Sequence, residues 1–227
     1  MGLNIRPIAI KNFINYSLVR LGIDTIDLYQ PCRLDNSVPV EDVIGTVADL
    51  IKEGKVRNLG VSEITADQLR KAHSVHPVTA LEIGYSLADR QIESDLLPAA
   101  KALGIGVVAF ANTAEGLLTG EMKAPLAAGS YQNHFPRFQG ENLVKNLEKV
   151  EVLKQLAKEK GFTPTQLAIA WVNAQGDHIM PLVSMSRRSR LPENTQAMEI
   201  TFTPEEMNTL HTHFAPGAIL GGTYLQR

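Results

Sequence analysis

Three arginines crowd the start of a predicted helix near the end of the chain. Residues 179–183 form a short apolar run, a polar turn follows, and Pro192 must then lie in the first turn of a helix, because proline is not tolerated deeper. Arg187, Arg188 and Arg190 therefore lie at the positive end of the helix dipole, where each cation costs about 0.3–1 kcal/mol. A bound phosphate would reverse that sign. The pattern leaves two interpretations open, a phosphate site or three solvated arginines that point at water.

The apolar pattern of the whole chain alternates between strands and helices. Strands are predicted near residues 24–30, 56–62, 80–86, 105–111 and 179–184. Helices are predicted over residues 8–21, 40–53, 65–75, 92–103, 143–160, 164–175 and 204–214. Repetition of a strand and a helix at intervals of roughly 25–30 residues indicates a parallel sheet with crossover helices. The loop over residues 115–141 is predicted to be lid-like or to lie on the substrate side, and residues 215–227 are expected to form a loose tail.

The composition is that of one globular domain. The chain has 227 residues, 44% of them apolar, and a net charge of −2, which provides no general attraction to nucleic acid or to an anionic membrane. A single cysteine excludes an intramolecular disulfide framework and fits a reducing, cytoplasmic location. No apolar run approaches 18 residues, no signal-peptide core follows Met1, and no zinc-ligand spacing occurs, so neither a membrane nor a metal is expected.

The arginine segment resembles the end of the last barrel strand of the aldo-keto reductases, a family that holds the adenosine and 2′-phosphate of NADPH there. The positions kept from the family's usual run are Pro181, Arg187, Arg188, Arg190, Leu191, Glu193 and Asn194. The resemblance implies that Arg190 holds the phosphate, with Glu193 and Asn194 near the adenine. Ser184 takes the place of a family glycine and is counted among the cofactor contacts. Serine or methionine replaces two family lysines and a threonine nearby, so the segment carries less positive charge than in the family. Weak cofactor binding is therefore expected.

Further cofactor positions follow from the same resemblance. Ser62 and Glu63, in the run GVSE, match residues that hydrogen-bond the nicotinamide amide, although Ser62 is equally suited to cap the helix that starts near residue 65. Glu82 stands where relatives carry a glutamine and lacks its donor half. Phe110 matches an aromatic residue that stacks on the nicotinamide, with a plain core role as the alternative. Glu115 departs from the family pattern and brings negative charge toward the pyrophosphate.

The resemblance also implies the architecture. The run RPIAIKNFINYSLVRLGIDTIDLYQ matches the family's third helix and fourth strand. The expectation is an α/β fold, an incomplete TIM (β/α)8 barrel with about five parallel strands and flanking helices, in which residues 1–227 form a single domain that lacks the first three βα units. Its end strands would be open edges, which favours self-association.

Catalysis is the function least well supported by matching residues. The family's catalytic aspartate, tyrosine and lysine have no counterpart, and Cys32 occupies the slot of its substrate-orienting histidine. A thiol is a weak hydrogen-bond donor that does not replace an imidazole N–H. Cys32 is interpreted as a small buried packing residue, with a nucleophilic thiol as the alternative.

Two functions remain open at this stage. The first is an NADP(H)-dependent oxidoreductase that acts on a small aldehyde or ketone and is catalytically impaired unless the missing units are supplied by a longer reading frame or another chain. The second is a non-catalytic NADP(H)-binding or regulatory remnant of the family.

Overall fold

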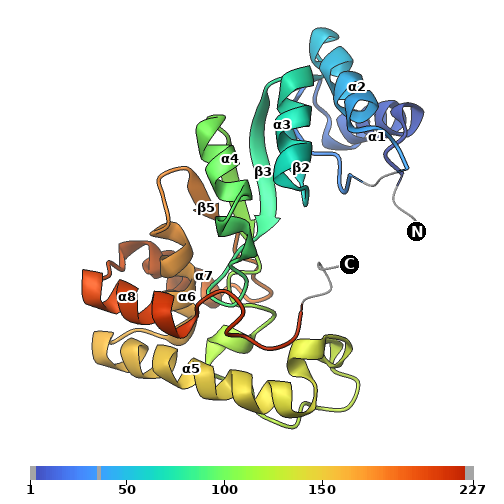
Figure 1. Cartoon of the computed structure of the whole chain (residues 1–227). Helices are drawn as coiled ribbons and strands as arrows, with labels where there is room; N and C mark the ends of the chain where they lie inside the picture. Colours follow the sequence, from blue (N-terminus) through green and yellow to red (C-terminus); the bar gives the residue numbers. More distant parts are fainter. Residues whose placement is uncertain (1–3, 35–36, 223–227) are drawn as a thin grey trace. The chain divides into compact units, whose positions relative to one another are not determined.

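The structure is a computed structural model that describes residues 4–34 and 37–222 (Figure 1). It contains one five-stranded sheet with the strand order β1-β2-β3-β4-β5. The strands are β1 (Ile26–Tyr29), β2 (Val56–Ser62), β3 (Val78–Gly84), β4 (Gly106–Phe110) and β5 (Ile179–Pro181). The predicted α/β fold with five parallel strands and flanking helices is therefore confirmed.

The chain divides into two compact units. Unit 1 comprises Met1–Ile83 and Ile92–Val108, and unit 2 comprises Gly84–Gln91 and Ala109–Arg227. The single domain predicted over residues 1–227 stays a prediction.

Unit 1 is built from the first three strands, most of β4 and four helices. The helices are α1 (Pro7–Leu21), α2 (Val40–Lys52), α3 (Ala66–Val75) and α4 (Leu96–Ala102), with a 3-10 turn η1 (Gln91–Glu93) at the unit boundary. Figure 1 shows α3 lying along β2 and β3, with α2 beside it. Val43, Ile44 and Val47 of α2 are fully buried, as are Leu59 and Val61 of β2, so helix and strand share one apolar core.

Local signals explain where the helices of unit 1 begin and end. Gly22 adopts φ 66° after α1, the left-handed conformation in which a glycine commonly ends a helix. Thr65 precedes α3 and forms a capping box with Gln68. The helix predicted over residues 92–103 begins only at Leu96, because Pro98 has to remain within its first turn.

Unit 2 contains β5 and the remaining helices. These are α5 (Gly140–Lys160), α6 (Pro164–Asn173), α7 (Arg190–Gln196) and α8 (Pro204–His213), with 3-10 turns η2 (Leu117–Thr119), η3 (Tyr131–His134), η4 (Pro136–Phe138) and η5 (Ala197–Glu199). Residues 167–172 of α6 are all buried, so this helix forms the centre of the unit. In Figure 1, α5 runs beside α6 and α8, and it contacts both.

The C-terminal segment corrects one expectation. Residues 215–222 are not loose, because the side chain of Asn146, buried in α5, accepts a hydrogen bond from the Leu220 N–H at 2.8 Å and donates one to the Leu220 carbonyl at 2.9 Å. Ile219 is buried as well. The rest of the predicted tail, residues 223–227, lies outside the described residues.

Candidate cofactor-binding site

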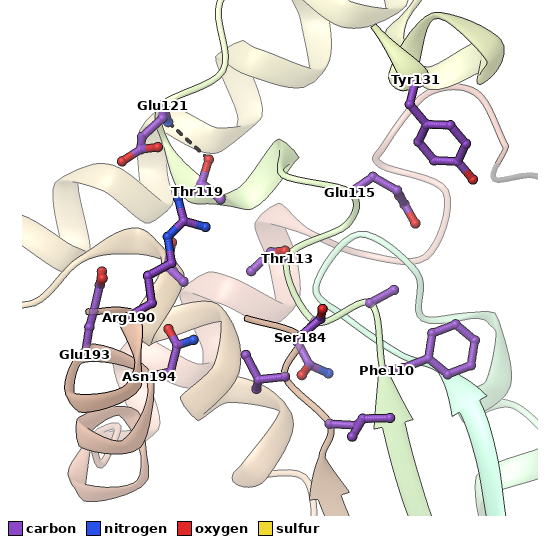
Figure 2. A pocket seen from close by; sticks show the side chains of 15 residues that line it. Phe110, Thr113, Glu115, Thr119, Glu121, Tyr131, Ser184, Arg190, Glu193 and Asn194 are labelled. Carbon is purple, nitrogen blue, oxygen red and sulfur yellow. Dashed lines mark hydrogen bonds between the residues drawn. The ribbon is translucent and has the colours of Figure 1, made fainter. Parts of the chain in front are cut away.

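A pocket of about 860 Å³ lies within unit 2 (Figure 2). Its wall is contributed by the loop after β4, by residues 182–184 after β5 and by α7, with further residues from the long loop over 115–141 and from α6. Among the predicted site residues, those that line it are Phe110, Ser184, Arg190, Glu193 and Asn194, and Glu115, predicted to bring negative charge toward the pyrophosphate, lines it as well. The structure therefore brings together predicted positions that are up to 84 residues apart in sequence, 194 minus 110.

The arginine corner forms one end of this pocket. Pro192 lies in the first turn of α7, as predicted, and β5 ends at Pro181, shorter than the predicted strand over residues 179–184. All three arginines are exposed, but Arg190 lines the pocket and Arg187 and Arg188 do not. α7 has only seven residues and its N-cap has no side-chain hydrogen bond. Of the three arginines, Arg190 alone therefore contributes a guanidinium to the pocket wall.

Glu193 and Asn194 are held in place by the start of α6. The Thr163 hydroxyl donates to Glu193 Oε1 at 3.0 Å, and Gln166 donates through Nε2 to the Glu193 carbonyl at 3.0 Å. Asn194 is buried, with 8% of its surface exposed. These contacts fix the turn of α7 that carries Arg190.

The loop after β4 forms the opposite wall. Phe110 is only half-buried and faces the pocket, which disfavours the alternative of a plain core residue. Asn112 is buried and donates from Nδ2 to the carbonyls of Tyr85 (3.3 Å) and Ala109 (2.9 Å), while its Oδ1 has no hydrogen-bond partner. Ala111 adopts φ 57°, which is strained for a residue with a side chain. Neither feature had a signal in the sequence, because an alanine gives no indication of a left-handed backbone.

A buried charge cluster lies behind this loop and was missed from the sequence. Arg137 is 1% exposed and forms a bidentate ion pair with Asp89, at 2.9 and 2.5 Å. Its Nη1 is also 3.5 Å from Glu115 Oε2. Burial raises the pKa of the Glu115 carboxyl; Arg137 opposes this rise and Asp89 adds to it.

The remaining predicted site residues lie in unit 1, where Ser62, Glu63 and Glu82 gather at the ends of β2 and β3. The Glu63 N–H donates to the Glu82 carbonyl at 3.0 Å, and Gln30 donates from Nε2 to Glu82 Oε2 at 2.6 Å. Arg33 pairs with Glu63 at 2.7 Å. Ser62 is buried and does not cap α3, since Thr65 does, so the capping interpretation of Ser62 is wrong.

Cys32 contradicts its predicted packing role. The thiol lies in the loop after β1 and is exposed. A loop that leaves the carboxyl end of a strand is at the surface rather than in the core. The interpretation of Cys32 as a small buried packing residue is therefore wrong.

We expect the Glu63 carboxyl to make the stability of the fold depend on pH. Burial raises its pKa, Arg33 lowers it and Glu82 raises it further, and Oε1 has no hydrogen-bond partner. A raised folded-state pKa means that stability is fully present below the unfolded value of about 4.3 and is lost as pH rises through the folded value. Thermal unfolding should show that Glu63→Gln gains stability over the wild type as pH increases from about 4.5 to 8.

Glu41 provides a control of opposite sign. The hydrogen bond from Lys71 lowers the pKa of Glu41, so its contribution is present above the unfolded value of about 4.3 and lost as pH falls. Glu41→Gln should therefore have a lower melting temperature than the wild type at neutral pH and the same melting temperature in acid. A Glu63→Gln curve that runs parallel to the wild type at every pH would contradict the assignment of Glu63.

The structure carries no sign of a membrane span or of a metal centre in the part of the chain that it describes. Among residues 4–34 and 37–222, no helix has the length and apolar character needed to cross a bilayer. Within the same ranges, no group of three or more His, Cys, Asp or Glu side chains is arranged to hold a metal ion.

Comparison with known proteins identifies the family to which the chain belongs. Residues 4–214 match the model of the aldo/keto reductase family, so the chain belongs to that family. It is similar in structure to the glycerol dehydrogenase AKR11B4 from Gluconobacter oxydans, with a TM-score of 0.88, 27% sequence identity, and coverage of 97% of this chain and 68% of the other. It also shares the fold of the thermostable aldo-keto reductase Tm1743, solved in complex with the inhibitor epalrestat, with a TM-score of 0.75, 24% identity, and coverage of 92% and 67%.

Proposed function

We propose that the chain is an NADP(H)-dependent oxidoreductase that acts on the carbonyl group of a small aldehyde or ketone. The observation that carries this proposal is the pocket of unit 2, which collects Phe110, Ser184, Arg190 and Asn194 in a chain of the aldo/keto reductase family. An aromatic ring, a guanidinium and uncharged hydrogen-bonding groups around one cavity are the groups that a dinucleotide with a 2′-phosphate requires.

The residues of the pocket suit the 2′-phosphate end of the cofactor better than its other anionic groups. Arg190 offers five N–H donors for a phosphate, and the fixed turn of α7 holds it at the pocket wall. Glu115 and Glu121 also line the cavity and oppose anionic groups. We therefore expect NADP(H) to bind weakly, with Arg190 as the main attraction.

The roles of the other residues follow from this placement. Arg190 would hold the 2′-phosphate, Glu193 and Asn194 would border the adenine, Ser184 would contact the cofactor between them and the ring of Phe110 would stack on the nicotinamide. Ser62, Glu63 and Glu82 lie in unit 1 and do not line this pocket, so their predicted contact with the carboxamide stays a prediction. When bound, NADPH supplies the hydride that reduces the carbonyl.

Replacement of Arg190 by alanine tests the cofactor site. The variant should lose about 1–3 kcal/mol of NADPH affinity, because a charge-assisted contact with the 2′-phosphate disappears. Affinity for NADH should change much less, since NADH carries no 2′-phosphate. Titration calorimetry with both cofactors measures the two losses.

Arg188 supplies a matched control, since it lies two residues away and does not line the pocket. Arg188→Ala should leave both affinities nearly unchanged. Equal losses of NADPH and NADH affinity in Arg190→Ala would exclude a phosphate contact, and no binding of either cofactor at millimolar concentration by the wild type would refute the proposed function.

A second function, cofactor binding without turnover, is favoured by the exposed Cys32. This thiol stands where the family places a histidine that orients the carbonyl, and it cannot supply a strong N–H donor. NADPH consumption should be followed with a panel of aldehydes and ketones under conditions where binding has been measured. Saturable binding with no consumption would favour the non-catalytic, regulatory role.

We also propose self-association of the chain. β1 is at one end of the strand order, and α1 in the same unit exposes Ile8, Tyr16 and Val19, each by 67% or more. Unpaired edges and exposed apolar side chains favour association with a second copy. Sedimentation velocity would detect it, and a monomer at all concentrations would argue against it. The cytoplasmic location stays a prediction.

A further inference from the structure

Glu115 has an unusual position in the pocket wall. Its backbone is left-handed (φ 53°), as is that of Ala114 before it (φ 50°), and only 14% of its side chain is exposed. Figure 2 shows the side chain turned toward the end of the pocket where Tyr131 lies, away from Arg190. The strained turn thus holds a carboxyl group in the cavity wall at a distance from the pocket's guanidinium.

The cation nearest to Glu115 is already committed to another carboxylate. Arg137 makes two hydrogen bonds to Asp89, and Asp89 is itself fixed by Ser86, whose Oγ accepts from the Asp89 N–H at 3.2 Å. Glu115 is left with a 3.5 Å approach to Arg137, and its Oε2 has no hydrogen-bond partner. Two carboxylates therefore share one guanidinium, and the cluster has one negative charge in excess whenever both are ionised.

The rest of the lining does not compensate for this excess. The charged residues around the cavity are Glu115, Glu121, Glu193 and Arg190, three carboxylates against one guanidinium. A like charge in a poorly solvated wall is screened much less than one in water. An anionic ligand that occupies this pocket therefore meets repulsion. Glu121 is exposed to solvent and Glu193 accepts a hydrogen bond from Thr163, whereas Glu115 is largely buried and its Oε2 has no hydrogen-bond partner, so its charge is the least compensated.

We propose that Glu115 determines the charge of the ligand that the pocket accepts: with its carboxyl neutral the pocket admits a phosphate-bearing nucleotide, and with its carboxylate ionised the pocket opposes one. This inference rests on the proposed function and adds a specificity-determining residue to it.

The surroundings of Glu115 favour its neutral form more than water does. Burial raises the pKa of Glu115, an effect that Asp89 reinforces and Arg137 partly cancels. The groups that face it are Asp89 and Arg137 behind the loop and Tyr131 at the same end of the pocket. Around the remaining wall the charged groups are Glu121, Glu193 and Arg190.

The dissociation constant of NADP⁺ should be measured by titration calorimetry between pH 5.5 and 8 for the wild type, Glu115→Gln and Glu115→Asp. NADP⁺ is chosen because its reduced form decays in acid. The ratio of the wild-type and Gln constants cancels the titration of the ligand's own phosphate. At pH 8 the Gln variant should bind on the order of tenfold more tightly, the effect of one like charge about 12 Å from a ligand charge at an effective dielectric constant near 20. The ratio should approach one as pH falls.

Two variants control for shape and for charge in general. Asp tolerates a left-handed backbone and keeps the charge, so Glu115→Asp should remain close to the wild type at pH 8. Glu121→Gln removes an exposed carboxylate from the same lining and should tighten binding by less than about threefold, because solvent screens it.

Equal dissociation constants for the wild type and Glu115→Gln at every pH would overturn the inference and leave the proposed function standing. Glu115→Asp binding as tightly as Glu115→Gln would also overturn it, because shape rather than charge would then be responsible. Binding by Glu115→Gln alone would support it strongly. No binding by any variant at millimolar NADP⁺ would refute the proposed function and this inference with it.

Discussion

Replacement of Arg137 by methionine should lower the free energy of unfolding by about 3–5 kcal/mol, the range for breaking a buried ion pair on one side. Methionine keeps much of the apolar stem but removes the guanidinium, so Asp89 loses both of its hydrogen bonds from Arg137. Glu115 loses its ion-pair partner, the same guanidinium, at the same time. Urea unfolding followed by circular dichroism measures the loss.

A double-mutant cycle assigns the loss to charge. Glu115→Gln in the Arg137→Met background removes one of the two carboxylates left without a cation, so the double variant should be more stable than Arg137→Met alone at pH 8. The gain should shrink in acid, where the carboxyl of Glu115 is neutral. A cost below about 1 kcal/mol for Arg137→Met would show that the pair is hydrated rather than buried.

The elements that follow local rules could be predicted from the sequence. β2 was predicted at its observed bounds, and α1 and α2 end at glycines with left-handed backbones, Gly22 and Gly54. These signals depend on a few adjacent residues, because a capping glycine or an alternating strand acts through backbone conformation alone. Periodicity is less reliable for burial: Ile8, Phe13 and Leu21 are apolar residues of α1, and all three are exposed.

The candidate site was predicted best where one short motif contains several of its residues. Ser184, Arg190, Glu193 and Asn194 belong to one short segment, and the structure places all of them in one pocket. The exposure of Cys32 depends on the course of a loop, which no periodicity describes.

Contacts between residues far apart in the sequence could not be predicted from any local pattern. Asp89 and Arg137 are 48 residues apart, and each taken alone is an ordinary charged residue of a loop. The left-handed backbone of Ala111 and Glu115 is imposed by the packing of the loop after β4, since neither residue prefers it. Tertiary structure, rather than local preference, therefore creates the feature that is proposed to control ligand charge.

Replacement of Asn146 by alanine should cost about 3 kcal/mol of stability and release the segment over residues 215–222. The side chain is fully buried and makes three hydrogen bonds, to the carbonyls of Arg137 and Leu220 at 2.9 Å each and from the Leu220 N–H at 2.8 Å. Each contributes about 1 kcal/mol, and the backbone groups left behind remain partly desolvated. Gly221 lies against the backbone of residues 136–137, so release of this segment also removes a packing contact from the turn that holds Arg137.

Asn142 in the same helix is the matched control. It donates a single exposed hydrogen bond, to the Pro136 carbonyl at 3.0 Å, so Asn142→Ala should cost well under about 1 kcal/mol. Limited proteolysis separates a local from a global effect: Asn146→Ala should be cut first within residues 215–222, while Asn142→Ala resists like the wild type. Similar unfolding curves and cleavage patterns for the two variants would mean that Asn146 does not secure the segment. A selective effect would show that one buried amide couples the segment over residues 215–222 to the turn behind the pocket, because the same side chain bonds both Arg137 and Leu220.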